Sequence, residues 1–226
     1  MYDLLTGPGL KLSIGICLIG LIIRGGVLYI KGLHWQLDRV AYTAHLKAGI
    51  RGALRSIFFW ILPFGARGWR TQPLMTVLFF GFHIGAVCIP LFLAAHTMIL
   101  QKALGISFAS LNQTVADVMS WGVVVSAFFL ALRRLVLPEV RILSGPYDYL
   151  ILFLSAAPFI TGLLCRYEIG DYSFFLLIHI LLGEILLISI PFTRLSHILL
   201  FFLSRAQLGM DFGIKRGGMK GKGLNW

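Results

Sequence analysis

Charged residues are scarce in this chain of 226 residues, where they make up 13% of the sequence against 58% for hydrophobic residues. Mean hydropathy is +0.87. Typical soluble domains are about 45–50% apolar and about 25% charged. The composition therefore excludes an ordinary soluble enzyme domain, and we find no segment that could form one. It predicts a single integral membrane domain built only from α-helices.

Cysteine is also scarce, and the three residues, Cys17, Cys88 and Cys165, lie apart from one another in apolar runs. No CxxC or CxxCH pattern occurs. This spacing argues against covalent c-type haem attachment and against a cysteine-ligated iron–sulfur cluster within this subunit. The sequence also lacks an internal repeat, which disfavours a small transporter. It lacks a cleavable signal pattern, so we expect the first apolar run to be kept as a membrane helix.

Apolar runs long enough to cross a bilayer are plentiful, since a crossing takes about 20 residues in a helix. Their presence predicts a polytopic, all-α fold with five transmembrane helices. The predicted helices cover residues 9–30, 74–99, 114–136, 147–166 and 173–203. The remaining residues, 204–226, are predicted to form a basic cytoplasmic tail, extended until it meets a partner.

The net charge of +11 is distributed in alternate connections. Lys and Arg concentrate in residues 31–70, 133–141 and 205–222, while the connections between them carry few. Because cytoplasmic connections are the basic ones, this pattern predicts an N-terminus outside and a C-terminus in the cytoplasm. It also argues against nucleic acid as the partner of the positive charge.

The first basic segment contains a short apolar stretch, SIFFWILPF, at residues 56–64. It is too short to span a bilayer and is flanked by arginines. We interpret it as an interfacial amphipathic element, with a buried contact to a partner subunit as the alternative. His34 and His45 lie in the same basic segment and are interpreted as solvated or interfacial.

Four other histidines lie inside apolar segments, in two pairs. His83 and His96 share one predicted helix, and His179 and His197 share another. An imidazole in hydrocarbon needs a partner, because an unsatisfied polar group there costs several kcal/mol. Two histidines on each of two helices suggest four axial ligands for two b-type haems held between the second and fifth helices. One haem, or none, remains open.

Helix geometry gives the pairing. Thirteen residues separate His83 from His96, about 20 Å of rise, and 18 residues separate His179 from His197, about 27 Å. Antiparallel helices then pair His96 with His179 on the outer side and His83 with His197 on the inner side. Eighteen residues return to the same helical face, whereas 13 residues are about 140° out of phase. A kink at Pro90 would re-aim the second ligand.

Three further residues are candidates for the site. Arg194 precedes His197 by three residues and would pair with a haem propionate, or snorkel to the interface. Glu184 is the acid deepest in a membrane helix, and such a residue is a functional candidate for quinone or proton chemistry. Asp117 is the second such candidate, with a favourable helix-start position as the alternative explanation.

Several stretches resemble a known family. FHIG at 82–85, LRRLVLPEVR at 132–141 and IHILLG…PFTRLSH at 178–197 resemble the cytochrome b subunits typified by the gamma subunit of respiratory nitrate reductase. The opening MYDLLTGP and the ending SRAQLGMDFGIKRGGMKG are similar to the branch found in transmembrane electron-transfer complexes of sulfate-reducing bacteria.

The resemblance implies bis-histidine b haems at all four histidines and a location in the bacterial inner (cytoplasmic) membrane. It implies a cytoplasmic iron–sulfur subunit like heterodisulfide reductase and a periplasmic multihaem cytochrome c as partners, with a membrane quinone such as menaquinone as a further one. The expected function is electron transfer across the membrane, in a direction that the sequence leaves open, within an oxidoreductase complex. A non-redox membrane anchor subunit is the alternative.

Overall fold

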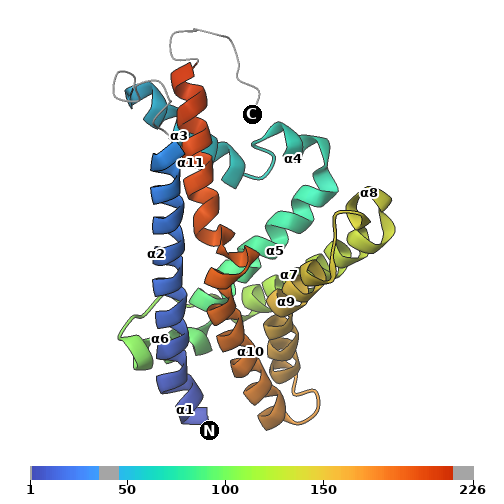
Figure 1. Cartoon of the computed structure of the whole chain (residues 1–226). Coiled ribbons are helices and arrows are strands. Elements are labelled where there is room, and N and C mark those ends of the chain that lie inside the picture. The colour runs from blue at the N-terminus through green and yellow to red at the C-terminus, as the bar shows by residue number, and fades with distance from the viewer. Residues whose placement is uncertain (1, 36–45, 216–226) are drawn as a thin grey trace. The chain divides into compact units, whose positions relative to one another are not determined.

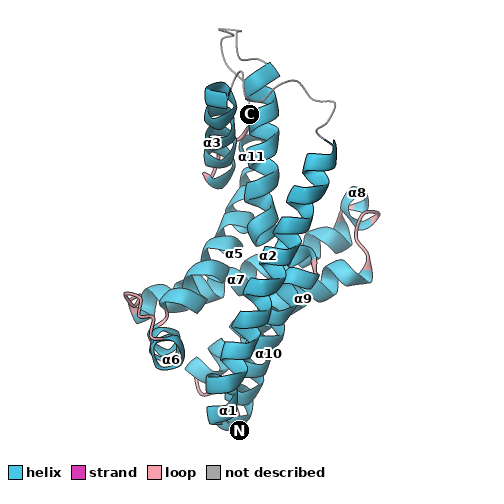
Figure 2. Ribbon diagram, turned by 60° about the vertical axis from the view of Figure 1, so that its left-hand side comes forward, coloured by secondary structure: helices cyan, strands magenta, loops and turns pink. Residues whose placement is uncertain are grey.

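The structure, a computed structural model, describes residues 2–35 and 46–215, and these residues form helices and connecting turns without any strand (Figures 1 and 2). This confirms the all-α prediction. The elements are α1 (Tyr2–Leu4), the π-helical turn η1 (Leu5–Gly9), α2 (Leu10–Trp35), α3 (Leu46–Ile61), α4 (Arg67–Thr71), α5 (Pro73–Phe92), α6 (Ala94–Leu104), α7 (Gln113–Val136), α8 (Pro138–Arg141), α9 (Pro146–Arg166), α10 (Tyr172–Phe192), the 3-10 turn η3 (Arg194–Ser196) and α11 (His197–Lys215).

Five helical segments in the described part of the chain are long and apolar enough to cross a membrane. Many of their large apolar side chains are exposed on the isolated chain, as a lipid environment requires. The prediction of five spans is confirmed, and the chain is a multi-pass membrane protein. The segments are Tyr2–Leu28, Pro73–Phe92, Gln113–Val136, Pro146–Arg166 and Tyr172–Phe192.

The predicted helix 74–99 is wrong in its extent, because it is broken at Leu93. This residue has extended backbone angles, φ −69° and ψ 133°, and separates α5 from α6. Pro90 lies three residues earlier, and a proline inside a helix removes one backbone hydrogen bond and clashes with the preceding turn. The expected change of direction between His83 and His96 is therefore a full break of the helix.

The predicted helix 173–203 is wrong for the same kind of reason. Helix α10 ends at Phe192, directly after Pro191, and Thr193 is extended with φ −118° and ψ −173°. The Oγ1 of Thr193 accepts a hydrogen bond from the backbone N–H of Leu195 at 3.2 Å, which caps the new turn. Because no single helix joins His179 to His197, the argument that 18 residues return to one face does not hold.

Two further predicted segments are now placed. Residues 204–215, expected to be extended, are the second half of α11, and the rest of the predicted tail lies outside the described residues. Residues 56–61 of the apolar stretch form the end of a longer amphipathic helix, α3, which begins at Leu46 and ends at Ile61, and residues 62–64 follow in a turn. The prediction of an amphipathic element is confirmed, whereas its start was placed ten residues too late. His34 and His45 lie where the structure describes no side chains.

The described residues divide into two compact units. The first holds residues 2–17 and 77–190. Its core is a contact between Ile89 of α5, Val123 of α7 and Phe159 of α9. Gly85 permits this contact, because a Cβ atom there would meet the side chain of Val123 and lie 3.1 Å from the carbonyl oxygen of Met119. The first unit thus contains both His96 and His179.

The second unit holds residues 18–35, 46–76 and 191–215. Its main contact is between α3 and α11, which run side by side (Figures 1 and 2). A Cβ atom at Gly52, Gly209 or Gly213 would run into the backbone of the other helix. Small residues let helices approach this closely, as in the small-xxx-small interfaces of membrane proteins. The Arg205 guanidinium lies 4.3 Å from the ring centroid of Trp60 and adds a cation–π contact.

We predict that Gly52→Ala separates α3 from α11, because the added methyl group would overlap the Gly209 carbonyl. Overpacking of this kind costs about 1–3 kcal/mol, whereas Gly26→Ala, with no neighbour within 4 Å, should be neutral or gain up to about 1 kcal/mol. Hydrogen exchange of the α3 amides in the purified full chain is the measurement. Equal exchange in the two variants would contradict the tight glycine contact.

Candidate functional site

The structure brings His96 and His179 together within the first unit. His96 lies on α6, three residues after the break at Leu93, and His179 lies on α10. Their ring centroids are 5.9 Å apart and the ring planes differ by 8°. Both rings are only partly exposed. The two histidines predicted to form the outer pair are therefore neighbours, while their role as metal ligands stays a prediction.

His179 is held by α9. Its Nδ1 donates a hydrogen bond to the carbonyl oxygen of Pro158 at 2.8 Å and lies 3.3 Å from the hydroxyl of Thr161. Gly162 completes the cradle, since a Cβ atom at this position would lie 3.1 Å from the His179 Cε1. Three residues of one helical turn thus fix the ring through a hydrogen bond, a polar contact and the space that a missing side chain leaves.

His96 is held by the end of α5. Its Nδ1 donates to the carbonyl oxygen of Ile89 at 3.2 Å, across the break. That carbonyl also accepts from the backbone N–H of Leu93 at 3.0 Å. The break is what permits the bond, because a continuous helix places side chains seven residues apart about two turns from each other along the axis. The local fold around Pro90 therefore sets the direction of the His96 ring.

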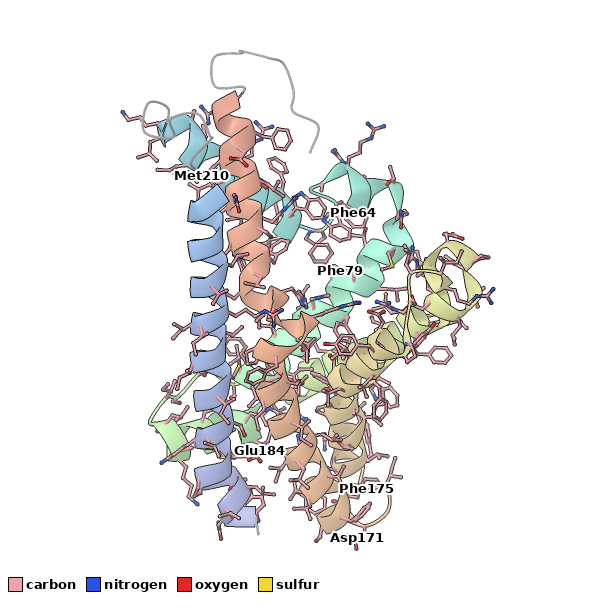
Figure 3. All side chains as sticks on the ribbon, in the orientation of Figure 1. Phe64, Phe79, Asp171, Phe175, Glu184 and Met210 are labelled. Carbon is pink, nitrogen blue, oxygen red and sulfur yellow. The ribbon has the colours of Figure 1, made fainter. Side chains whose placement is uncertain are left out.

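His83 and His197 belong to different units. His83 lies on α5, and its Nδ1 donates to the carbonyl oxygen of Phe79 at 2.7 Å. The ring of Phe79, labelled in Figure 3, lies 4.0 Å from the His83 ring centroid. His197 is the first residue of α11, and its Nδ1 donates to the carbonyl oxygen of Arg194 at 2.9 Å. Their pairing stays a prediction.

All four predicted ligands therefore share one arrangement. A carbonyl oxygen can only accept, so each Nδ1 is the donor in these bonds, and in the neutral ring this leaves the lone pair on Nε2. Metal-binding histidines almost always donate their other ring N–H in this way, which fixes the tautomer and the ring orientation. The donor set fits axial ligation by neutral imidazole.

The rings of His96 and His179 are also close enough for one haem to contact both. Their ring centroids are 5.9 Å apart and the ring planes are nearly parallel. Within residues 2–35 and 46–215, no three His, Cys, Asp or Glu side chains gather as a metal site. A bis-histidine haem does not need a third side chain, because the porphyrin occupies the other positions of the iron.

Arg194, the predicted propionate partner, begins η3 and is exposed on the chain. Its backbone carbonyl accepts the His197 bond, so the two residues are linked through the main chain. The guanidinium role stays a prediction.

Asp117 is engaged in an ion pair at one end of the α7–α9 pair. Its Oδ1 lies 3.2 Å from the Nε of Arg166, and the side chain of Gln113 donates to the same oxygen at 2.8 Å. Trp121 and Tyr167 are hydrogen-bonded close to this ion pair in sequence, at 3.3 Å. A carboxylate that is already paired is less suited to take a proton than an unpaired one.

Glu184 is placed differently. Figure 3 labels it on α10, where its carboxyl lies against η1: a Cβ atom at Gly9 would be 2.7 Å from Oε1. This oxygen is buried and has no hydrogen-bond partner among the described residues. An unsatisfied buried oxygen is costly, and in a membrane helix it marks a functional candidate. Of the two predicted acids, Glu184 is therefore the one whose structure leaves an acceptor available.

Sequence reasoning missed the residues that hold the histidines. Pro158, Thr161 and Gly162 act on His179 from another helix, and no spacing in the sequence links the two segments. The Ile89 carbonyl was missed because it depends on the break at Leu93. Pro90 was the available signal in the sequence. It indicated that the helix changes direction before His96, but it did not indicate which carbonyl accepts the hydrogen bond from the His96 ring.

A comparison with curated proteins adds one finding. The chain is 52% identical over 227 residues, covering the whole of both chains, to a protein of Nitratidesulfovibrio vulgaris strain Hildenborough whose description reads "Protein". This chain belongs to the same family as that protein. The description of the relative states no activity, so the relationship adds no function.

Neither a protein-family model nor a solved structure matches the chain. The resemblance to the cytochrome b subunits therefore rests on the sequence motifs and stays a prediction.

We predict that Gly162→Val displaces the His179 ring, because a side chain at this position meets Cε1 and Nδ1. Gly183→Val on α10 is the matched control, since nothing lies within 4 Å of a Cβ atom there and the cost in helix propensity is the same. If His179 binds one of the two predicted haems, about half of the haem per chain should be lost in the first variant only. Haem content of the purified proteins is the measurement, and equal content in both variants would refute the cradle.

Proposed function

We propose that the chain is a dihaem cytochrome b subunit that carries electrons across the membrane. The observation that supports this best is the shared arrangement of His83, His96, His179 and His197. Each Nδ1 donates to a backbone carbonyl at 2.7–3.2 Å. Four histidines inside apolar segments that each donate Nδ1–H to a backbone carbonyl support a set of four metal ligands, because ligating histidines usually donate their other ring N–H in this way.

When bound, the haems supply the one-electron chemistry. The residues of this chain would bind and orient the haems. His96 and His179 would hold one haem, and His83 and His197 the other. The backbone carbonyls raise the basicity of the imidazoles and orient them, which is one of the means by which a protein tunes a reduction potential.

The depths of the histidines support a path rather than a single centre. Nine residues of α5, about 13 Å of helical rise, separate His83 from the end of the helix at Phe92, and His96 lies beyond that end on α6. The hydrocarbon core is about 30 Å thick. Two ligand pairs at different depths would divide the crossing into shorter transfers. The alternation of basic connections supports an outward N-terminus and a cytoplasmic C-terminus.

The proposed partners lie on opposite sides. On the outer side, near His96 and His179, we propose exchange with a membrane quinone such as menaquinone or with a periplasmic multihaem cytochrome c. On the inner side we propose a cytoplasmic iron–sulfur subunit resembling heterodisulfide reductase, approached through the basic C-terminal segment. The relative comes from a sulfate-reducing bacterium, which agrees with the branch that the motifs resemble.

Glu184 is the residue we propose to accept a proton during quinol oxidation. It shares α10 with His179, five residues away, and its buried Oε1 is unpartnered in the described structure. Asp117 was the second candidate from the sequence. Its ion pair with Arg166 now favours a structural role that joins the ends of α7 and α9.

We predict that His→Ala at each ligand position removes one haem and leaves the other. His96→Ala and His179→Ala should abolish the same component of the reduced-minus-oxidised spectrum, and His83→Ala and His197→Ala the other component, because each iron needs both of its axial ligands. His34→Ala, outside the ligand set, serves as the control and should keep both components.

Two outcomes decide against the proposal. Loss of the same component in His83→Ala and His179→Ala would make the pairing wrong. No haem spectrum in the purified wild-type chain would make the redox function wrong and leave a non-redox membrane anchor as the function.

We predict that Glu184→Gln slows quinol-driven haem reduction at least tenfold while the haem content stays the same, because the amide cannot take a proton. Asp117→Asn should have less than a threefold effect, since its carboxylate is paired with Arg166. Stopped-flow reduction by a menaquinol analogue is the measurement. The reverse order of effects would assign the proton role to Asp117, and no quinol-driven reduction in the wild type would favour direct exchange with a periplasmic cytochrome.

A further inference from the structure

Helix α3 has three different faces, and only one of them is used in the described structure. The first face is made of buried residues with side chains no larger than a serine, Gly49, Gly52, Ala53 and Ser56, of which Gly52 and Ala53 lie against the backbone of α11. At 100° per residue these four positions lie within about 100° of one another around the helix. The contact with α11 therefore occupies less than a third of the circumference.

The second face is apolar and exposed. Ile50, Leu54 and Phe58 follow one another at intervals of four residues and are 47%, 64% and 58% exposed. Leu46 and Ile61 extend the same stripe and are also exposed. A stripe of this size on a water-facing helix would be an aggregation liability, so it needs a cover. Within the second unit no described element provides one.

The third face is basic. Lys47, Arg51 and Arg55 are also four residues apart and exposed, so they form a stripe directly beside the apolar one. The Arg55 guanidinium lies 5.5 Å from the ring centroid of Phe59, so its stem runs along the helix surface. The segment from Leu46 to Ile61 contains no acidic residue, so the stripe has no counter-charge of its own.

We propose that this exposed side of α3 binds the surface of a bilayer through anionic phospholipid headgroups. A helix that lies in a membrane interface buries its apolar stripe about 5–10 Å into the acyl boundary, with basic side chains reaching the headgroups at its edge. The two adjacent stripes of α3 have this arrangement. A shallow hollow runs over both, and all the residues that line it belong to α3 or to the next position, Leu62.

The charge pattern favours lipid over a protein partner. Three cations at a regular spacing, with no acid among them, match a continuous anionic surface, and each basic residue near such a surface contributes about 1 kcal/mol. The core of a protein interface is instead depleted of charge. The inference is independent of the haem proposal, because α3 contains none of the four histidines.

The experiment uses the full chain in detergent micelles. Cys17, Cys88 and Cys165 are replaced by Ala, Leu54→Cys is introduced, and the new thiol carries an environment-sensitive fluorophore. Brominated phosphatidylglycerol or brominated phosphatidylcholine is then titrated, since bromine quenches a fluorophore only on contact. We expect half-quenching at a lower mole fraction of the anionic lipid. In Lys47→Gln/Arg51→Gln/Arg55→Gln, the apparent affinity for phosphatidylglycerol should fall on the order of 100-fold, about fivefold per cation removed.

Removal of three other basic residues, Arg133→Gln/Arg134→Gln/Arg141→Gln, is the matched control and should change the half-quenching point by less than about twofold. Retained hydrogen-exchange protection of α11 shows that the α3 variants are folded. Equal quenching by the two lipids in the parent chain, or an unchanged preference in the α3 triple variant, would overturn the proposal. Absence of quenching by either lipid would also overturn it and assign the face to a protein partner.

Discussion

The fold depends on one constraint: inside hydrocarbon every backbone N–H and C=O must find a partner within the protein. Unbroken helices meet this condition by themselves, but both histidine-bearing segments are broken. Each break leaves a backbone carbonyl without its helical partner, and a donor from another segment forms a hydrogen bond to that carbonyl. The backbone N–H of Leu111 donates to Phe92 at 2.8 Å, and the Arg24 guanidinium donates to Pro191 at 2.8 Å. The breaks are therefore satisfied features of the structure.

The same breaks position the chemistry. Pro90 precedes the break at Leu93, and His96 follows it by three residues. Pro191 precedes the break at Thr193, and His197 follows it by four residues. In both segments the histidine ring bonds to a carbonyl at or near the interruption. The same order of proline, helix break and histidine thus occurs in both segments. As a result, the direction of the His96 and His197 imidazoles depends on the backbone and not on flexible side chains.

Small residues make the remaining contacts possible. Gly85 lets α5 approach α7, Gly162 leaves space for the His179 ring, and Gly52 meets Gly209 between α3 and α11. Lipid gives no hydrophobic drive for helices to associate, so close packing has to supply the attraction. In α3 this has a further consequence. Because glycine and alanine take up one face, the apolar and basic residues are left on the opposite side, where a bilayer surface suits both.

The sequence by itself determined the properties that follow from composition and length. The five spans, the all-helical class and the presence of paired histidines in apolar segments required only hydropathy and spacing. It did not determine where the fifth helix ends, because a proline is tolerated in many membrane helices and breaks only some of them. The sequence also did not predict the extent of α11. The residues through which α11 packs against α3 are glycines, and glycine has a low helix propensity.

The tertiary structure decided the relations between segments. The approach of His96 to His179, the Pro158 and Gly162 cradle, the ion pair that occupies Asp117 and the buried oxygen of Glu184 all join residues from different helices. Spacing within one helix carries no information on such contacts. They are set by which helices pack together and by where a helix is interrupted, and both depend on the whole chain satisfying its polar groups at once.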